Sequence, residues 1–282
     1  MLKQRVFTAV LMAAAFLLGV YWLSIPILAF LFALVIALGA WEWAPLAGLN
    51  HPFSRVMYLA AIVFGAFMLY RYAEFGGGVA LGPERERVQP ILGAGCFWWC
   101  LALLGVRSYP GSAGLWNTLV LRACMGALVL LPAWFAAIYL LWLEPRGVFM
   151  IAMVLIVATA DIGAYFTGRA FGRHALAPKV SPGKTWEGLW GGVFCVALLC
   201  TAVWSFLPPR FDHLSLGVLL LVALVTGLAS VLGDLTVSMV KRVGGVKDSG
   251  SLLPGHGGIL DRLDSLCAAA PTFALSLLLA NF

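Results

Sequence analysis

Hydrophobic residues form long uninterrupted runs along this chain, and polar residues gather in the short stretches between them. A helix needs about 20 apolar residues to cross the hydrocarbon core of a bilayer. Because the first two runs are separated only at Leu23 to Pro26, we expect a helical hairpin there. Reading the whole chain at that length predicts nine spans, at residues 6–22, 25–43, 55–72, 90–106, 118–142, 148–168, 187–208, 213–240 and 259–281.

The runs are continuously apolar rather than alternating, which argues against a transmembrane barrel and leaves helix as the way to satisfy the backbone in lipid. The composition agrees, because 62% of the 282 residues are hydrophobic and 11% are charged. Soluble domains average about 25% charged residues. The fold class that we expect is therefore all-α, a polytopic integral membrane protein with about nine transmembrane helices.

The positive charges predict an orientation. Lys3 and Arg5 precede a first run that continues past Ala15 without the polar break of a cleaved signal, so we interpret it as a retained span. With the N-terminus inside, 13 of the 18 Lys and Arg residues fall on the inner side, as the positive-inside rule requires. We expect a bacterial-type cytoplasmic (inner) membrane, with the N-terminus and both polar loops of the C-terminal half facing the cytoplasm.

Two features of the apolar runs carry little chemistry. Glu42 stands between Trp41 and Trp43 at the end of a predicted span, and an interfacial anchor is favoured there over a buried functional carboxylate. The cysteines have no metal-ligand spacing and are interpreted as small packing residues: Cys96, Cys100, Cys124, Cys195, Cys200 and Cys267.

The aspartates are distributed unevenly, since every one lies beyond residue 160. Asp212 falls in an outer loop and is interpreted as surface. The other five lie in or beside predicted cytoplasmic span ends: Asp161, Asp234, Asp248, Asp261 and Asp264. Clustered carboxylates are typical ligands of hard divalent cations, above all magnesium that bridges substrate phosphates. We therefore expect a cation and phosphate site at the inner membrane surface.

Helical spacing places these acids beside cations. Asp261 and Asp264 stand at i and i+3, on one face of the last span. The preceding span aligns Asp234, Ser238, Lys241 and Arg242 in the same way. Two helices would thus present carboxylates and cations toward one cleft.

The linker between these two spans is rich in glycine, which allows backbone N–H groups to approach an anion closely. Lys241, Arg242 and Lys247 add positive charge. His256 either contacts a phosphate or moves a proton, or it caps the next helix; both interpretations stay open.

A second polar region lies between residues 161 and 188. Its Gly183-Lys184-Thr185 suggests a nucleotide-binding P-loop, but Pro178 occupies the position where that motif requires glycine, so a P-loop is rejected. A short basic loop from Arg169 to Lys184 remains. It leads into a helix with Ser181 or Thr185 as N-cap and Glu187 in its first turn, where free N–H groups favour an anion.

These polar segments carry a resemblance. Residues 238–264, S-x-x-K-R-x4-K-D-x-G-x3-P-G-H-G-G-x2-D-R-x-D, resemble the signature of the phosphatidate cytidylyltransferases, also called CDP-diacylglycerol synthases. The segments D-x-x-A-Y-x-x-G-R and S-P-G-K-T-W-E-G are similar to that family as well, so the likeness covers about residues 155–270. Gly183 departs from the pattern, because some relatives carry a second lysine there.

The resemblance implies that CTP and phosphatidic acid give CDP-diacylglycerol and pyrophosphate, with one or two magnesium ions and in a homodimer; whether a monovalent cation joins them stays open. It implies metal ligands at Asp234, Asp261 and Asp264. It implies catalytic positions at Asp234, Lys241, Arg242, Lys247, Asp248, His256 and Asp261. It implies substrate contacts at Asp161, Ser181, Lys184, Thr185, Glu187, Ser238 and Arg262. We accordingly divide the chain into N-terminal transmembrane helices (1–145) and a C-terminal catalytic transmembrane region (146–282).

Two other classes stay open. A transporter or ion pathway also carries intramembrane acids and cations, although here the charges gather at span ends rather than at the midplane. A CTP-dependent lipid kinase would release CDP instead of pyrophosphate. A CDP-alcohol phosphatidyltransferase is disfavoured, since its D-G-x2-A-R segment is absent from the chain.

Overall fold

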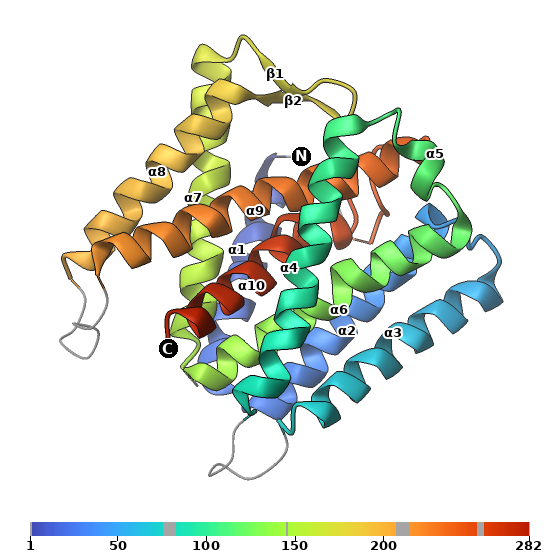
Figure 1. Ribbon diagram of the computed structural model, residues 1–282, viewed down its shortest axis with the longest axis horizontal. Helices are drawn as coiled ribbons and strands as arrows, with labels where there is room; N and C mark the ends of the chain where they lie inside the picture. The colour runs from blue at the N-terminus through green and yellow to red at the C-terminus, as the bar shows by residue number, and fades with distance from the viewer. Residues whose placement is uncertain (1, 76–82, 145, 207–214, 253–256, 282) are drawn as a thin grey trace.

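The protein is described by a computed structural model that covers all residues except 1, 76–82, 145, 207–214, 253–256 and 282. Its helices, drawn in Figure 1, are α1 (Leu2–Trp22), α2 (Ile25–Leu46), α3 (Pro52–Tyr72), α4 (Arg85–Ser108), α5 (Ala113–Trp116), α6 (Leu119–Leu143), α7 (Val148–Phe171), α8 (Trp186–Trp204), α9 (Leu216–Val243) and α10 (Leu260–Leu279). Two short strands, β1 (Ala175–Ala177) and β2 (Ser181–Thr185), stand between α7 and α8.

The prediction of an all-α polytopic membrane protein is confirmed. Within the described residues, eight helices are long and apolar enough to cross a membrane, namely α2 to α4 and α6 to α10. The fully described part of α1, Ala13–Trp22, is a shorter apolar helix. The expected hairpin between the first two runs is also present, since α1 ends at Trp22 and α2 begins at Ile25.

Local signals explain where several helices begin. Thr118 accepts a hydrogen bond from the backbone N–H of Leu121 and caps α6, and Ser215 does the same for α9 through Val218. Each cap satisfies one of the N–H groups that lack a partner in the first turn. α9 continues past the expected end at residue 240 to Val243, so its last turn includes charged side chains.

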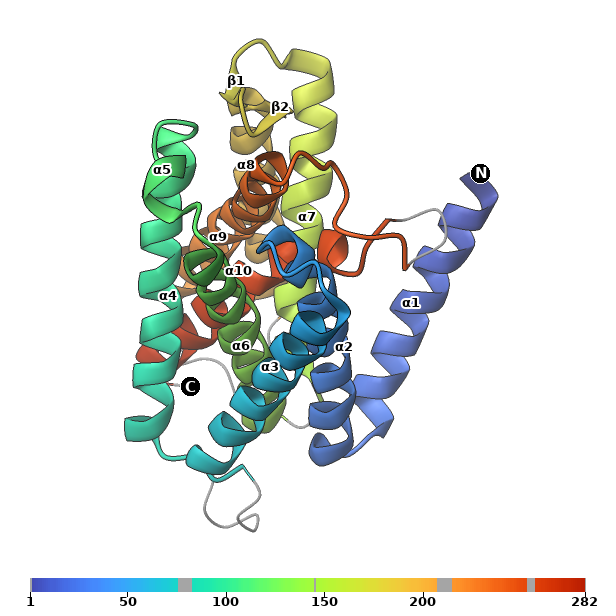
Figure 2. The same cartoon turned by 90° about the vertical axis from the view of Figure 1, so that its right-hand side faces the viewer.

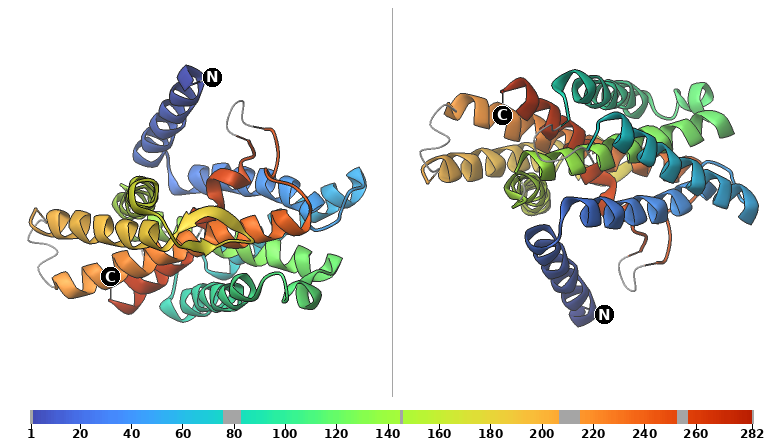
Figure 3. Two further views of the ribbon diagram at one scale, coloured as in Figure 1. Left: turned by 90° about the horizontal axis from the view of Figure 1, so that it is seen from above. Right: turned by 90° about the horizontal axis from the view of Figure 1, so that it is seen from below.

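The helix α10 lies inside the molecule, packed against α9, α6, α4, α7 and α2 (Figure 1). It and α6 are the most buried of the candidate spans. The outer helix α8 instead exposes Trp190, Phe194 and Leu198, as a helix in contact with lipid does. Figures 2 and 3 show α1 leaning away from the other helices.

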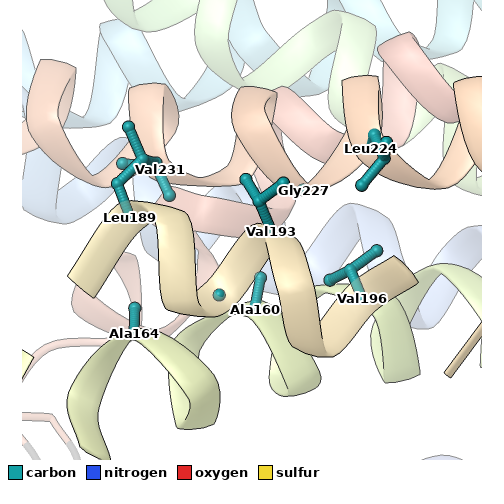
Figure 4. Close-up of a pocket in the computed structure, with 9 residues that line it drawn as sticks. Ala160, Ala164, Leu189, Val193, Val196, Leu224, Gly227 and Val231 are labelled. Carbon is teal, nitrogen blue, oxygen red and sulfur yellow. The ribbon is translucent and has the colours of Figure 1, made fainter. Parts of the chain in front are cut away.

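The helices α7, α8 and α9 approach one another through small residues. A Cβ added at Gly188 would lie 2.8 Å from the carbonyl oxygen of Ala164, and one at Gly192 would lie 2.6 Å from that of Ala160. Figure 4 shows the apolar side chains that α7, α8 and α9 direct into the narrow pocket between them. Because that pocket is lined only by Ala, Leu, Gly and Val, we assign it to packing rather than chemistry.

The basic segment between Arg169 and Lys184 was expected to be a loop and contains instead the antiparallel pair β1–β2, with Ala175 opposite Thr185 and Ala177 opposite Ser181. Arg242 Nε in α9 donates to the Val180 carbonyl oxygen at 3.0 Å. The tertiary contact to α9 thus stabilises a hairpin that is too short to be detected in the sequence.

The loops predicted to be cytoplasmic lie on one side of the molecule. At the end of α2, Trp43 Nε1 donates to the Arg122 carbonyl oxygen near the start of α6 at 2.8 Å, and Arg122 Nη1 donates to the Leu46 carbonyl oxygen at 2.9 Å. The contact of Arg242 with Val180 joins the end of α9 to the hairpin. These contacts agree with the predicted order of spans.

Candidate active site

One face of α9 carries a row of polar side chains toward its C-terminal end. Ser238 Oγ donates to Asp234 Oδ1 at 3.1 Å, one turn apart on the helix. Lys241 stands one turn further, and both Ser238 and Lys241 are buried at 7% exposure. The predicted alignment of these residues along one helix is therefore confirmed.

The hairpin brings the second polar region onto this row. Lys184, in β2, places its Nζ 2.5 Å from Asp234 Oδ2, and both side chains are partly exposed. Thr185 is the N-cap of α8, accepting from the backbone N–H of Gly188 at 3.1 Å, so of the two predicted caps it is the one observed. The two polar regions, 50 residues apart in sequence at Lys184 and Asp234, form one site.

The second ion pair joins α9 to α10. Lys241 Nζ lies 2.6 Å from Asp261 Oδ1, and the two side chains are only 8% and 9% exposed. Asp261 Oδ2 accepts from the backbone N–H groups of Ser249 and Gly258, both at 3.0 Å. A buried ion pair with additional hydrogen bonds of this kind is costly to break, because removal of one partner leaves an uncompensated charge.

Asp264 lies one turn beyond Asp261 and is buried at 8% exposure. The helices α9 and α10 meet here, since a Cβ at Gly233 would overlap the Asp264 carbonyl oxygen. Asp264 interacts electrostatically with Asp234, Lys184 and Lys241. All three predicted metal ligands thus belong to one charged cluster.

The three aspartates are of the residue type that binds a divalent cation. Carboxylate oxygens are the ligands that magnesium prefers. In this structure, however, Asp234 and Asp261 each contact the ammonium group of a lysine. Among the described residues, no three Asp, Glu, His or Cys side chains lie close enough together to hold a metal ion. The metal assignment to Asp234, Asp261 and Asp264 stays a prediction.

A pocket of about 320 Å³ opens beside the cluster, with a mainly apolar lining that includes a few charged and polar side chains. Asp161 and Arg169 of α7 and Lys184 and Thr185 of the hairpin contribute its polar lining. A second pocket of about 480 Å³ adjoins it and is almost wholly apolar. The two share Leu176, Leu189 and Val231. The first pocket thus adds charged side chains to an apolar lining that continues into the second, an arrangement that suits a substrate with a charged headgroup and apolar chains.

Two other predicted substrate or catalytic residues contact the hairpin. Glu187 Oε1 lies 2.6 Å from His174 Nδ1, and Glu187 Oε2 accepts from the backbone N–H of His174 at 3.2 Å. Arg242 contacts Val180 as described above. Ser181 begins β2 and is partly buried. These contacts position the hairpin that carries Lys184.

The remaining predicted residues flank the cluster. Lys247 and Asp248 are exposed in the segment that follows α9, and Arg262 is exposed in the first turn of α10. His256 lies outside the described residues. The roles predicted for these four residues stay predictions.

The structure corrects the interpretation of Glu42. The favoured interfacial anchor is wrong, because the residue is only 3% exposed and its carboxylate accepts hydrogen bonds from Ser249, Ile259 and Leu260. The one signal in the sequence was a carboxylate at the end of an apolar run. Its partners lie more than 200 residues away, and no local pattern identifies them.

The chain is similar to known proteins along its whole length. The cytidylyltransferase family matches residues 3–280. The chain is 43% identical over 283 residues to a phosphatidate cytidylyltransferase of Pseudomonas aeruginosa, covering 100% of this chain and 99% of that one. It is 41% identical over 290 residues to one of Haemophilus influenzae, covering 97% and 98%. A Staphylococcus epidermidis phosphatidate cytidylyltransferase is 46% identical over 124 residues, 44% of this chain and 46% of that one.

Proposed function

Because the chain belongs to the cytidylyltransferase family, we propose that it transfers the cytidylyl group of CTP to phosphatidic acid, giving CDP-diacylglycerol and pyrophosphate. The full-length relatives of Pseudomonas aeruginosa and Haemophilus influenzae carry the name of this activity. The observation that carries the proposal is the pairing of Lys184 in the hairpin with Asp234 of α9, and of Lys241 with Asp261 where α9 ends and α10 begins.

The cytidylyl transfer requires neutralisation of the negative charges on the two substrates more than it requires a general base. A phosphate oxygen of the lipid attacks the α-phosphorus of CTP, the bond from that phosphorus to the bridging oxygen breaks, and pyrophosphate leaves with the electron pair. The attacking oxygen is already anionic, so the main barrier is repulsion between the two substrates. Lys184 and Lys241 supply positive charge that stabilises the transition state and the leaving group.

We propose one or two magnesium ions as cofactor, held by Asp234, Asp261 and Asp264. When bound, magnesium would neutralise phosphate oxygens of the nucleotide. Ser238, which donates to Asp234, orients that carboxylate. The protein residues thus arrange fixed charges before the substrates meet.

The paired pockets support a lipid as the acceptor. The headgroup would lie beside Asp161 and Lys184 in the first pocket, while the chains would follow the second, almost wholly apolar pocket between α4, α8 and α9. CTP would enter from the cytoplasm, which places the site at the inner face of a bacterial inner membrane. The N-terminus in the cytoplasm and the homodimer belong to the same proposal.

The two alternative functions, a transporter and a lipid kinase, require different positions of the charges or a different nucleotide product. A transporter would use charges near the middle of its helices, whereas Asp261 lies in the first turn of α10 and Lys241 in the last turn of α9. A lipid kinase would transfer the terminal phosphate of CTP and release CDP. The position of the Lys241–Asp261 pair favours a reaction at the membrane surface over transport. The nucleotide product separates the cytidylyltransferase from the lipid kinase.

Substitution of the acids tests the proposal. Asp234→Asn and Asp261→Asn, purified in detergent micelles with CTP, phosphatidate and magnesium, should each lower turnover by about 100-fold or more. Both variants should elute as folded protein, although Asp261→Asn leaves Lys241 buried without its partner and should unfold at a lower temperature. Glu86→Gln, which replaces an exposed carboxylate in α4, should behave as wild type. Near-normal formation of CDP-diacylglycerol by either Asp variant would remove that residue from the site.

A further inference from the structure

Glu42 brings a buried carboxylate from α2 to the start of α10. Its Oε2 accepts from Ser249 Oγ at 2.9 Å and from the backbone N–H of Leu260 at 2.9 Å. Its Oε1 accepts from the backbone N–H of Ile259 at 3.0 Å. N–H groups at a helix start lack partners within the helix and carry the positive end of its dipole, so a carboxylate is the favoured partner there.

Asp261, in the first turn of α10, joins the same two segments to each other. Ser249 directs its hydroxyl to Glu42 and its backbone N–H to Asp261. At the start of α10, Gly258 donates its backbone N–H to Asp261, while the next two residues donate to Glu42. Glu42 of α2 and Asp261 of α10 therefore both join the segment at Ser249 to the start of α10, and each contact restricts the movement of the same backbone.

Two glycines of the polar linker make room for this carboxylate. A Cβ at Gly250 would lie 2.5 Å from Glu42 Oε1, and a Cβ at Gly258 would overlap both Glu42 Oε2 and Ser249 Oγ. Real Cβ contacts are longer than this, so any larger residue must displace Glu42. These glycines are accounted for by the approach of α2 to the linker.

We propose that Glu42 is a positioning residue for the transfer reaction: it holds Ser249 and the start of α10 so that Asp261 faces Lys241. The inference rests on the proposed function, since it assigns Glu42 a role in that reaction. It also gives the N-terminal half of the chain a contribution to the site. A glutamine would fit the same space but would direct an NH₂ group toward N–H and O–H donors, losing part of the network.

Hydrogen exchange tests the position of the segment without reference to any reaction. In Glu42→Gln, the peptide that contains Ile259 and Leu260 should exchange faster than in wild type, while peptides of α7 and α8 should be unchanged. The matched variant Glu86→Gln should leave every peptide unchanged. Unchanged exchange at the start of α10 in Glu42→Gln would overturn the positioning role, whatever reaction the protein catalyses.

A double-mutant cycle tests the link to Asp261. Alone, Glu42→Gln should lower kcat by about 10- to 100-fold, the range expected for a misplaced catalytic group. In the Asp261→Asn background it should lower kcat less than threefold further, since residues that act as a unit are non-additive. Losses that multiply would contradict the proposal, because Glu42 would then act independently of Asp261.

Ser249→Ala keeps the test decisive if Glu42→Gln does not fold. It removes the hydroxyl that Glu42 accepts and retains the backbone N–H that Asp261 accepts. We expect a loss in kcat of about threefold to tenfold, as for one hydrogen bond, with faster exchange in the same peptide. Wild-type kcat together with wild-type exchange in Ser249→Ala would refute the role of this contact.

Discussion

The two lysines of the cluster sit in different surroundings. The Lys241–Asp261 side chains are 8% and 9% exposed, whereas those of Lys184 and Asp234 are 25% and 28% exposed. Desolvated charges depend on each other far more strongly than charges in contact with water. We therefore expect Lys184 to leave its partner for a substrate phosphate more readily, and Lys241 to matter more for the folded state.

This difference predicts unequal losses of stability. Lys241→Met should lower the free energy of unfolding by about 3–5 kcal/mol, because Asp261 would remain buried and unpaired. Adding Asp261→Asn should recover most of that loss but no activity. Lys184→Met should cost about 1 kcal/mol or less. Thermal unfolding in detergent measures all three, and equal losses for the two lysine variants would contradict the assignment.

The sequence predicts the site only as far as local spacing extends. Asp234, Ser238 and Lys241 recur at helical intervals, so their common face was predictable. Glu42 has no such companions, and only the folded chain shows that its carboxylate meets Ser249. Contacts between segments far apart in the chain follow from packing, which no short pattern encodes.

At the scale of elements, α7 and α8 pack through glycine and alanine because lipid provides little hydrophobic drive between helices, and close backbone contact replaces it. Gly188 and Gly192 lie against the carbonyl oxygens of Ala164 and Ala160. This packing supports the base of the hairpin, since β2 leads directly into α8.

Substitution of one glycine tests this packing. Gly192→Val should destabilise the protein by about 1–3 kcal/mol, because the added methyl groups would meet the backbone of α7. Gly93→Ala, in α4, is the matched control, since a Cβ there meets nothing within 4 Å. Helix propensity alone would make Gly93→Ala neutral or stabilising. Thermal unfolding compares the two variants, and a loss of similar size in both would mean that the close approach to α7 is not the cause.

The membrane spans were predictable because a continuous run of apolar residues in lipid can satisfy its backbone hydrogen bonds only as a helix. The β1–β2 hairpin was not predictable from the sequence. Strands of three and five residues are too short to show alternation, and the pair is stabilised by Arg242 and Glu187 from outside it. The boundary at residue 145 between the two predicted regions stays a prediction.

At the scale of the whole molecule, the polar segments that form the candidate site share one side, and we propose that this side faces the cytoplasm. In a variant with its native cysteines replaced, Lys247→Cys should react with a membrane-impermeant thiol reagent only after spheroplasts are opened. Glu86→Cys, at the opposite end of the spans, should react in intact spheroplasts. The reverse pattern would invert the orientation and with it the entry of CTP.

The central claim is that the α-phosphate of CTP passes to a lipid phosphate. We would incubate purified protein in micelles with phosphatidate and CTP labelled at either the α- or the γ-phosphate, and count the lipid extract. The account predicts that the α-label enters the lipid, with one pyrophosphate released per lipid formed, and that the γ-label stays in solution. Transfer of the γ-label to lipid with release of CDP would contradict it.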